Sequence, residues 1–137
     1  MKLTTRSRYG LRAITYIAAK DHDHAISISE LAKELNLSDH YLEQLLRLLK
    51  KAGFVKSVRG VNGGYLLNRP AEEVTVYDLL NVLEGPLWLA ECTVCGECPG
   101  GNTNCPTRLI MRKMSQEIEK VTRAENLKEM AELYKAI

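Results

Sequence analysis

Several features are missing from this sequence of 137 residues, and each absence narrows the kind of protein it can be. There is no long apolar run and no signal peptide, which argues against a membrane protein and predicts a reducing, cytoplasmic compartment. There is no nucleotide-binding fingerprint and no nucleophile beside an evident base, so we expect no enzymatic activity. Repeats and low-complexity tracts are also absent, and the length suits one small domain with an appendage.

Cysteine is absent everywhere except in one loop of fourteen residues, which contains Cys92, Cys95, Cys98 and Cys105. The other residues of this loop are rich in glycine, proline and asparagine, which favour turns over packed structure. In a reducing compartment such a cluster favours a metal site over a disulfide framework. A redox-active dithiol and a leftover disulfide are the alternatives.

The charged residues are distributed unevenly along the chain. Residues 1–69 contain twelve Lys and Arg against six Asp and Glu, whereas residues 70–137 contain seven against eleven. A basic amino-terminal half is the charge distribution expected of a protein that binds a phosphate backbone. A solvated basic face would give the same count, so charge alone does not decide between the two.

A helix-turn-helix is predicted between residues 27 and 53. Ser27 and Glu30 form a capping-box pattern ahead of one helix, Ser38 caps the next, and Gly53 ends it. The residues of the second helix that would face a DNA major groove are Ser38, His40, Tyr41, Glu43, Gln44 and Arg47. Glutamine can pair with adenine and glutamate with cytosine, although a plain solvated helix face is the alternative.

A basic hairpin is predicted directly after these helices. Residues 54–59 and 65–68 have the composition of two strands, and the loop between them is rich in glycine. A helix-turn-helix followed by such a hairpin is a winged helix, and Arg59 at its tip is placed to enter a minor groove. The glycines that would let the wing backbone approach phosphates are Gly60, Gly63 and Gly64.

Helices are predicted on both sides of the cysteine loop. Thr75 begins a fourth helix that ends at Gly85, and Pro106 begins a fifth. The fifth helix has a narrow apolar stripe formed by Ile110, Met114, Ile118 and Val121. We expect this stripe to form a dimer interface, with packing against the first helix (residues 5–20) as the alternative. Thr122 and Glu125 are predicted to cap a final helix.

These patterns predict a mainly α fold with a small β-hairpin, in which a winged helix-turn-helix precedes a long C-terminal dimerisation helix. The expected parts are a DNA-binding domain (residues 1–85), a cysteine-rich loop (86–106) and dimerisation helices (107–137).

Motifs along the whole chain resemble those of the IscR/NsrR/CymR group of winged-helix transcription regulators. They are Met1-Lys-Leu-Thr-Thr-Arg-Ser-Arg-Tyr-Gly-Leu-Arg12, Leu37-Ser38 followed by Tyr41-Leu-Glu-Gln-Leu45, Val58-Arg-Gly60, Asn62-Gly-Gly-Tyr-Leu66 and Val82-Leu-Glu-Gly-Pro86. The resemblance implies a homodimeric repressor that binds a pseudo-palindromic operator in double-stranded DNA. It implies His40, Glu43 and Gln44 as base readers, with Arg59 in the wing. His40 replaces a small residue of some relatives, so we expect a different operator.

The resemblance also implies an iron–sulfur cluster that senses cluster supply, redox state or nitric oxide. Cys92, Cys98 and Cys105 are the best match for the three cysteine ligands of such members. The fourth ligands of different members correspond here to Arg108, Arg8 and Arg12, none of which is suitable. A 2Fe–2S cluster on three cysteines is favoured.

Three other interpretations of the cysteine loop remain open. With Cys95 as a fourth ligand, a 4Fe–4S cluster is possible, because the spacing loosely echoes a ferredoxin motif. A structural zinc site is the second, and a thiol-redox role of the same cysteines also remains. In each case the DNA-binding half of the prediction is unchanged.

Overall fold

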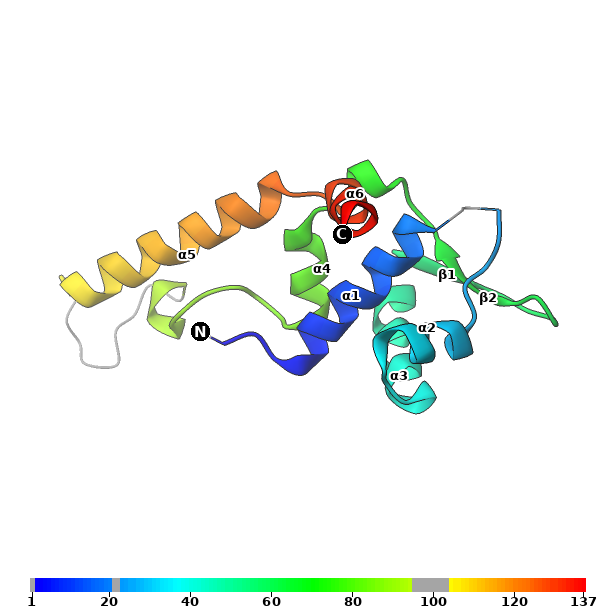
Figure 1. The fold of residues 1–137 in the computed structure, drawn as a ribbon. Coiled ribbons are helices and arrows are strands. Elements are labelled where there is room, and N and C mark those ends of the chain that lie inside the picture. The colour runs from blue at the N-terminus through cyan, green and yellow to red at the C-terminus, as the bar shows by residue number, and fades with distance from the viewer. Residues whose placement is uncertain (1, 21–22, 95–103) are drawn as a thin grey trace.

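A computed structural model describes residues 2–20, 23–94 and 104–137. In chain order the elements are α1 (Thr5–Ala19), α2 (Ile28–Leu35), α3 (Asp39–Lys51), β1 (Val55–Val58), β2 (Gly64–Leu67), the short 3-10 helix η1 (Ala71–Glu73), α4 (Val76–Leu83), a second 3-10 helix η2 (Glu91–Thr93), α5 (Pro106–Ala124) and α6 (Leu127–Ala136) (Figure 1). The predicted fold class is confirmed: the described residues are mainly α-helical with one antiparallel hairpin. None of the described helices is both long and apolar enough to cross a membrane.

Side chains at the helix starts explain where the helices begin. The side chains of Ser27, Ser38 and Thr75 each accept a hydrogen bond from the backbone N–H three residues later. The capping box predicted at Ser27 is only half formed, because the Glu30 carboxylate accepts a hydrogen bond from the Tyr16 hydroxyl at 2.7 Å instead. Glu30 therefore joins α2 to α1.

The predicted start of the last helix was wrong. Thr122 lies inside α5 and donates its hydroxyl hydrogen to the Ile118 carbonyl at 2.8 Å, whereas Asn126 and Glu129 form the capping box of α6. Backbone pairing sets this boundary, because the N–H of Val76 donates to the Glu125 carbonyl at 2.9 Å. The chain is therefore extended at Glu125, and α5 ends just before it.

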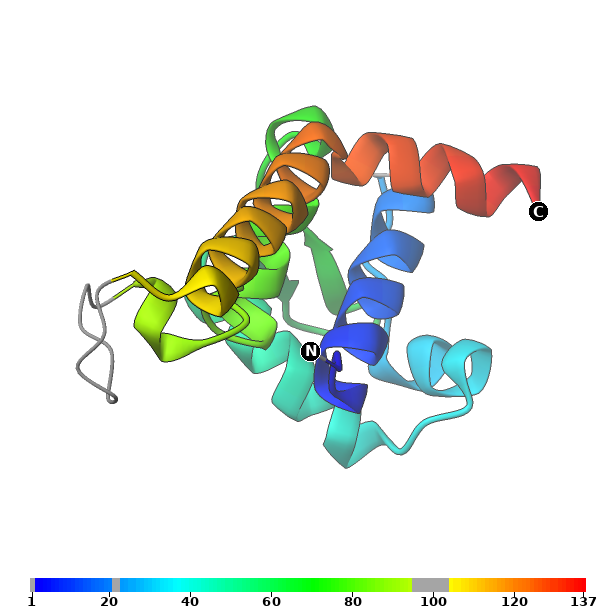
Figure 2. The same cartoon turned by 90° about the vertical axis from the view of Figure 1, so that its left-hand side faces the viewer.

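The core is mainly aliphatic and is organised around α1, which contacts α2, α3, α4, β2 and α6. Gly10 allows α1 to lie close to α4, since a Cβ there would be 2.6 Å from Leu83 Cδ1. After α5 the chain turns, and α6 packs across α1 while α5 extends away along α4 and η2 (Figures 1 and 2). In the described residues it is thus α6, rather than α5, that covers α1.

Candidate nucleic-acid interface and cysteine segment

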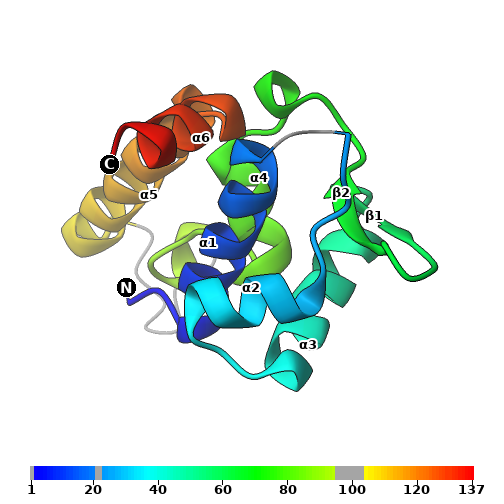
Figure 3. The same ribbon diagram turned by 45° about the vertical axis from the view of Figure 1, so that its right-hand side comes forward.

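The helix-turn-helix is formed by α2, α3 and the turn between them (Figure 3). Asn36 adopts a left-handed conformation with a φ of 54°, which lets the chain reverse within two residues before Ser38 caps α3. On α3 the buried positions are Leu42, Leu45, Leu46 and Leu49, all fully or almost fully inaccessible. The opposite side of the helix therefore faces solvent.

The predicted base readers share this outer side of α3. Ser38, His40, Glu43, Gln44 and Arg47 are all exposed. The Gln44 amide nitrogen lies 3.2 Å from the Nε2 atom of His40, so these two side chains form one polar patch over the first two turns. A side chain that carries both donors and acceptors can hydrogen-bond to base edges.

Tyr41 occupies a different position from the other predicted readers. Its side chain is half-buried, and its ring meets the Tyr9 ring edge-on with the centroids 6.3 Å apart. The hydroxyl oxygen is buried and has no hydrogen-bond partner among the described residues. A DNA contact by Tyr41 stays a prediction, and the geometry shows that its ring packs the start of α3 against α1.

The hairpin of β1 and β2 projects beyond the helices (Figure 1). Arg59 and Gly60 lie exposed at its tip. The Lys50 ammonium donates to the Ser57 hydroxyl at 2.8 Å, which ties α3 to β1. At its base the hairpin is anchored by the Asn68 side chain, which donates to the Gly53 carbonyl at 3.1 Å. The wing is thus held beside the exposed face of α3.

Two of the wing glycines lie so close to other backbone atoms that no side chain fits there. Gly64 has a φ of 154°, and a Cβ there would collide with the Ile26 carbonyl. At Gly63 a Cβ would collide with the Val58 carbonyl. Gly60 also has a positive φ, but a Cβ there would meet nothing within 4 Å. The close approach of all three glycines to DNA phosphates stays a prediction. The structure shows that Gly63 and Gly64 are also needed to avoid collisions within the protein.

The cysteine segment is described at its two ends. Cys92 lies in η2 and Cys105 precedes α5; both are free and half-buried, while Cys95 and Cys98 lie outside the described residues. Arg108 connects the two ends, because its Nε atom donates to the Cys92 carbonyl at 2.7 Å. The backbone N–H of Arg108, and that of Thr107 to a smaller extent, lower the pKa of the Cys105 thiol below its ordinary value.

These described thiols fit a soft metal or an iron–sulfur cluster in their chemistry. A metal or cluster binds the thiolate, and the lowered pKa favours the thiolate at Cys105. Within the described residues no three His, Cys, Asp or Glu side chains gather to form a metal site. Arg108, at the position where some members of the resembled group have a histidine ligand, is used as a hydrogen-bond donor. Sequence reasoning missed this structural role of Arg108, which lies in the first turn of α5, two residues after Pro106.

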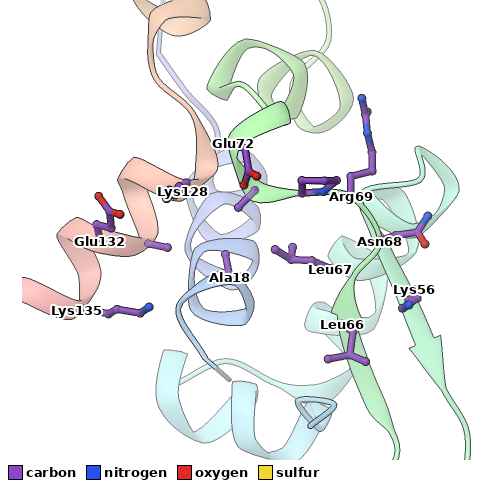
Figure 4. A pocket seen from close by; sticks show the side chains of 13 residues that line it. Ala18, Lys56, Leu66, Leu67, Asn68, Arg69, Glu72, Lys128, Glu132 and Lys135 are labelled. Atoms are coloured by element: carbon purple, nitrogen blue, oxygen red, sulfur yellow. The ribbon is translucent and has the colours of Figure 1, made fainter. Parts of the chain in front are cut away.

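Two further surface features lie outside this interface. A cavity of about 610 Å³ separates β2 and η1 from α6, and the side chains of Lys56, Lys128 and Lys135 surround its floor of Ala18 and Leu67 (Figure 4). Sequence reasoning gave no signal for this cavity. The second feature is the stripe on α5, where Ile110, Met114 and Val121 are all about half exposed or more.

Comparison with known proteins finds transcriptional regulators in each case. Residues 3–133 match the family model of Rrf2, described as an iron-dependent transcriptional regulator. The transcriptional regulator CymR of Bacillus subtilis is 45% identical over 87 residues, which cover 64% of this chain and 63% of that relative. IscR of Vibrio campbellii is 33% identical over 118 residues, which cover 86% of this chain and 70% of that relative.

Two solved structures are similar over almost the full chain. That of CymR, the global cysteine regulator of B. subtilis, has a TM-score of 0.82 and 34% identity, covering 97% of this chain and 98% of that one. That of T. potens IscR has a TM-score of 0.78 and 34% identity, covering 100% of this chain and 89% of that one. Relatives of both kinds are regulators and not enzymes. The chain belongs to the Rrf2 family of transcriptional regulators.

Proposed function

We propose that this regulator is a cytoplasmic homodimeric repressor that binds a pseudo-palindromic operator in duplex DNA. The observation that carries the proposal is the exposed polar face of α3 beside a hairpin with Arg59 at its tip. α3 would lie in the major groove, with His40, Glu43 and Gln44 against base edges. The wing would reach the adjacent minor groove, where arginine is favoured.

Arg59→Ala is expected to weaken operator binding by about tenfold to a hundredfold, because one cation in a minor groove is lost. The salt dependence of binding is expected to decrease by about one released counterion. Fluorescence anisotropy with a duplex that the protein selects from a random pool measures both quantities. Lys135→Ala, which removes the same charge from α6, is the control and should bind normally. Equal binding by Arg59→Ala and the unaltered protein would exclude a contact between the Arg59 side chain and DNA.

The apolar stripe on α5 supports the dimer. Ile110, Met114 and Val121 leave 57%, 49% and 61% of their surface exposed on one helix. An exposed apolar row on a long helix is typical of an interface between subunits. A second copy that presents the same stripe would cover it with twofold symmetry. Two α3 helices would then face two operator half-sites.

Met114→Glu is expected to raise the dimer dissociation constant by about thirtyfold or more, because a carboxylate would be buried at the centre of the stripe. Sedimentation equilibrium measures this change. Gln116→Glu adds the same charge to α5 outside the stripe and should leave the dimer intact. A Met114→Glu protein that remains fully dimeric would place the interface elsewhere.

For sensing, we infer that Cys92, Cys98 and Cys105 hold an iron–sulfur cluster, with 2Fe–2S favoured and Cys95 as the possible fourth ligand of a 4Fe–4S form. The support is the thiolate-favouring position of Cys105 and the iron-dependent description of the family. Bound there, such a cluster would supply redox and nitric oxide sensitivity. Thiol oxidation is a second candidate, since CymR of Staphylococcus aureus has also been solved in an oxidized form. A structural zinc site on the same thiolates is the other alternative.

Anaerobic purification with measurement of the visible spectrum and of iron, sulfide and zinc per chain tests the sensing proposal. Iron with equivalent sulfide and a brown chromophore is the expected result. Zinc without iron would favour a structural site, and metal-free thiols would favour oxidation chemistry. The DNA selection experiment is independent of all three outcomes, so the two halves of the proposal are tested separately.

A further inference from the structure

Glu84 makes the densest set of hydrogen bonds between distant parts of the described chain. One carboxylate oxygen accepts from the Thr4 hydroxyl at 2.7 Å, from the Thr4 backbone N–H at 3.2 Å and from the Ser7 hydroxyl. Ser7 is fully buried, and Thr4 is the N-terminal cap of α1. A charged acceptor makes stronger hydrogen bonds than a neutral one, so this carboxylate fixes the start of α1.

Glu84 also stands where the chain leaves the winged helix for the cysteine segment. It ends α4, with its N–H donating to the Leu80 carbonyl at 2.7 Å, and Gly85 follows with a φ of 95°. Residues 86–94 are then held on α5 by the Leu89 N–H, which donates to the Ser115 hydroxyl at 3.0 Å, and by the bond from Arg108 to the Cys92 carbonyl. Only Gly85 separates Glu84 from this segment, so a shift of residues 86–94 would act on the end of α4, where Glu84 lies.

From Glu84, a chain of side-chain contacts leads to the DNA-facing helix in two steps. The first is the set of bonds to Thr4 and Ser7 in the first turn of α1. The second is the edge-on contact between Tyr9 of α1 and Tyr41 in the first turn of α3. Tyr41 directly follows the predicted base reader His40. Packed side chains of this kind move together, because interiors are close-packed.

We propose that Glu84 is a positioning residue that transmits the position of residues 86–94 through α1 to the first turn of α3, and so sets DNA affinity. The inference rests on the proposed DNA-binding function and needs no particular metal or thiol chemistry. Arg108 binds residues 86–94 near their C-terminal end, at Cys92, and Glu84 lies just before their N-terminal end. The two residues therefore act on the same segment. A merely structural role of either residue would leave their effects independent.

A double-mutant cycle tests this coupling in metal-free, thiol-reduced protein. The variants are Arg108→Ala, Glu84→Gln and both together, with dissociation constants measured on a duplex that the protein selects from a random pool. Arg108→Ala is expected to weaken binding about tenfold in the unaltered background and at most about twofold in the Glu84→Gln background. In a Glu72→Gln background, an exposed carboxylate of η1, the tenfold effect should remain. An equal effect of Arg108→Ala in all three backgrounds, or no effect in any, overturns the proposal.

Hydrogen exchange of residues 3–9 separates a failure of this coupling from a failure of DNA binding. Arg108→Ala is expected to speed exchange there, and Glu84→Gln to do so with no further increase in the double variant. If no duplex is selected, the proposed DNA-binding function fails; exchange that Arg108→Ala leaves unchanged overturns the coupling itself. Ser7→Ala removes one of the three hydrogen bonds to the Glu84 carboxylate without a change in charge, and should reproduce part of the effect of Glu84→Gln if that variant folds poorly.

Discussion

Gly64→Ala is expected to destabilise the fold by about 3 kcal/mol or more, which corresponds to a decrease of roughly 10 °C in Tm. The added methyl group would collide with the peptide group between Ile26 and Ser27, including the Ser27 nitrogen at 2.8 Å and the carbonyl group of Ile26. Backbone cannot rotate away as a flexible side chain can. Two hydrogen bonds that join Ile26 to Tyr65, at 2.9 and 2.8 Å, would have to lengthen or break.

The Gly64→Ala substitution is also expected to disturb the helix-turn-helix. Ile26 and Ser27 lead directly into α2, and Ser27 is its cap. Because the same backbone pairing fixes the wing to the entry of α2, Gly64→Ala is also expected to weaken DNA binding by more than its loss of stability explains. Thermal unfolding and anisotropy at a temperature well below Tm measure the two effects separately.

Gly60→Ala is the matched control. Gly60 also has a positive φ, 113°, but its new Cβ would have open space around it. Only backbone strain is added, so we expect a loss of about 1–2 kcal/mol. The difference between the two variants reports mainly the cost of the collision. If both lose the same stability, the close approach of Gly64 to Ile26 contributes nothing.

The structural elements that are set by residues close together in the sequence could be predicted from it. Ser38 and Thr75 cap α3 and α4 as expected, and the leucines of α3 face inward, since caps and helical periodicity are local signals. The predicted start of the last helix was wrong because local capping signals were ambiguous there. Two capping patterns follow each other at Thr122 and Asn126, and a long-range backbone pair, which sequence does not reveal, decides between them.

The features that sequence could not provide all depend on contacts between distant residues. Glu84 lies 80 positions from Thr4, so nothing near either residue signals their bond. Tyr41 has the right position on α3 for a base contact, yet its ring packs against the Tyr9 ring of α1. From the sequence alone, Arg108 is only a residue that cannot serve as the fourth ligand. Its hydrogen bond to the Cys92 carbonyl depends on how η2 packs against α5.

Cys92→Ala is expected to reduce the iron and sulfide content of anaerobically purified protein to background, because a cluster on three cysteines loses a third of its thiolate ligands. The structure makes this variant a clean test. Arg108 binds the backbone carbonyl of Cys92 and not its sulfur, so the substitution leaves that bond and the local chain path intact. Circular dichroism and Tm should therefore stay close to those of the metal-free unaltered protein.

Cys95→Ala distinguishes the two ligand sets that the cysteine spacing leaves open. With three cysteine ligands it should retain iron and sulfide in full, and with four it should lose them as Cys92→Ala does. Cys105→Ala should match Cys92→Ala in either case, since Cys105 belongs to both proposed ligand sets. Full iron content in Cys92→Ala protein would exclude Cys92 as a ligand. Sensing would then have to reach residues 86–94, and through them Glu84, by a route that does not include the η2 thiol.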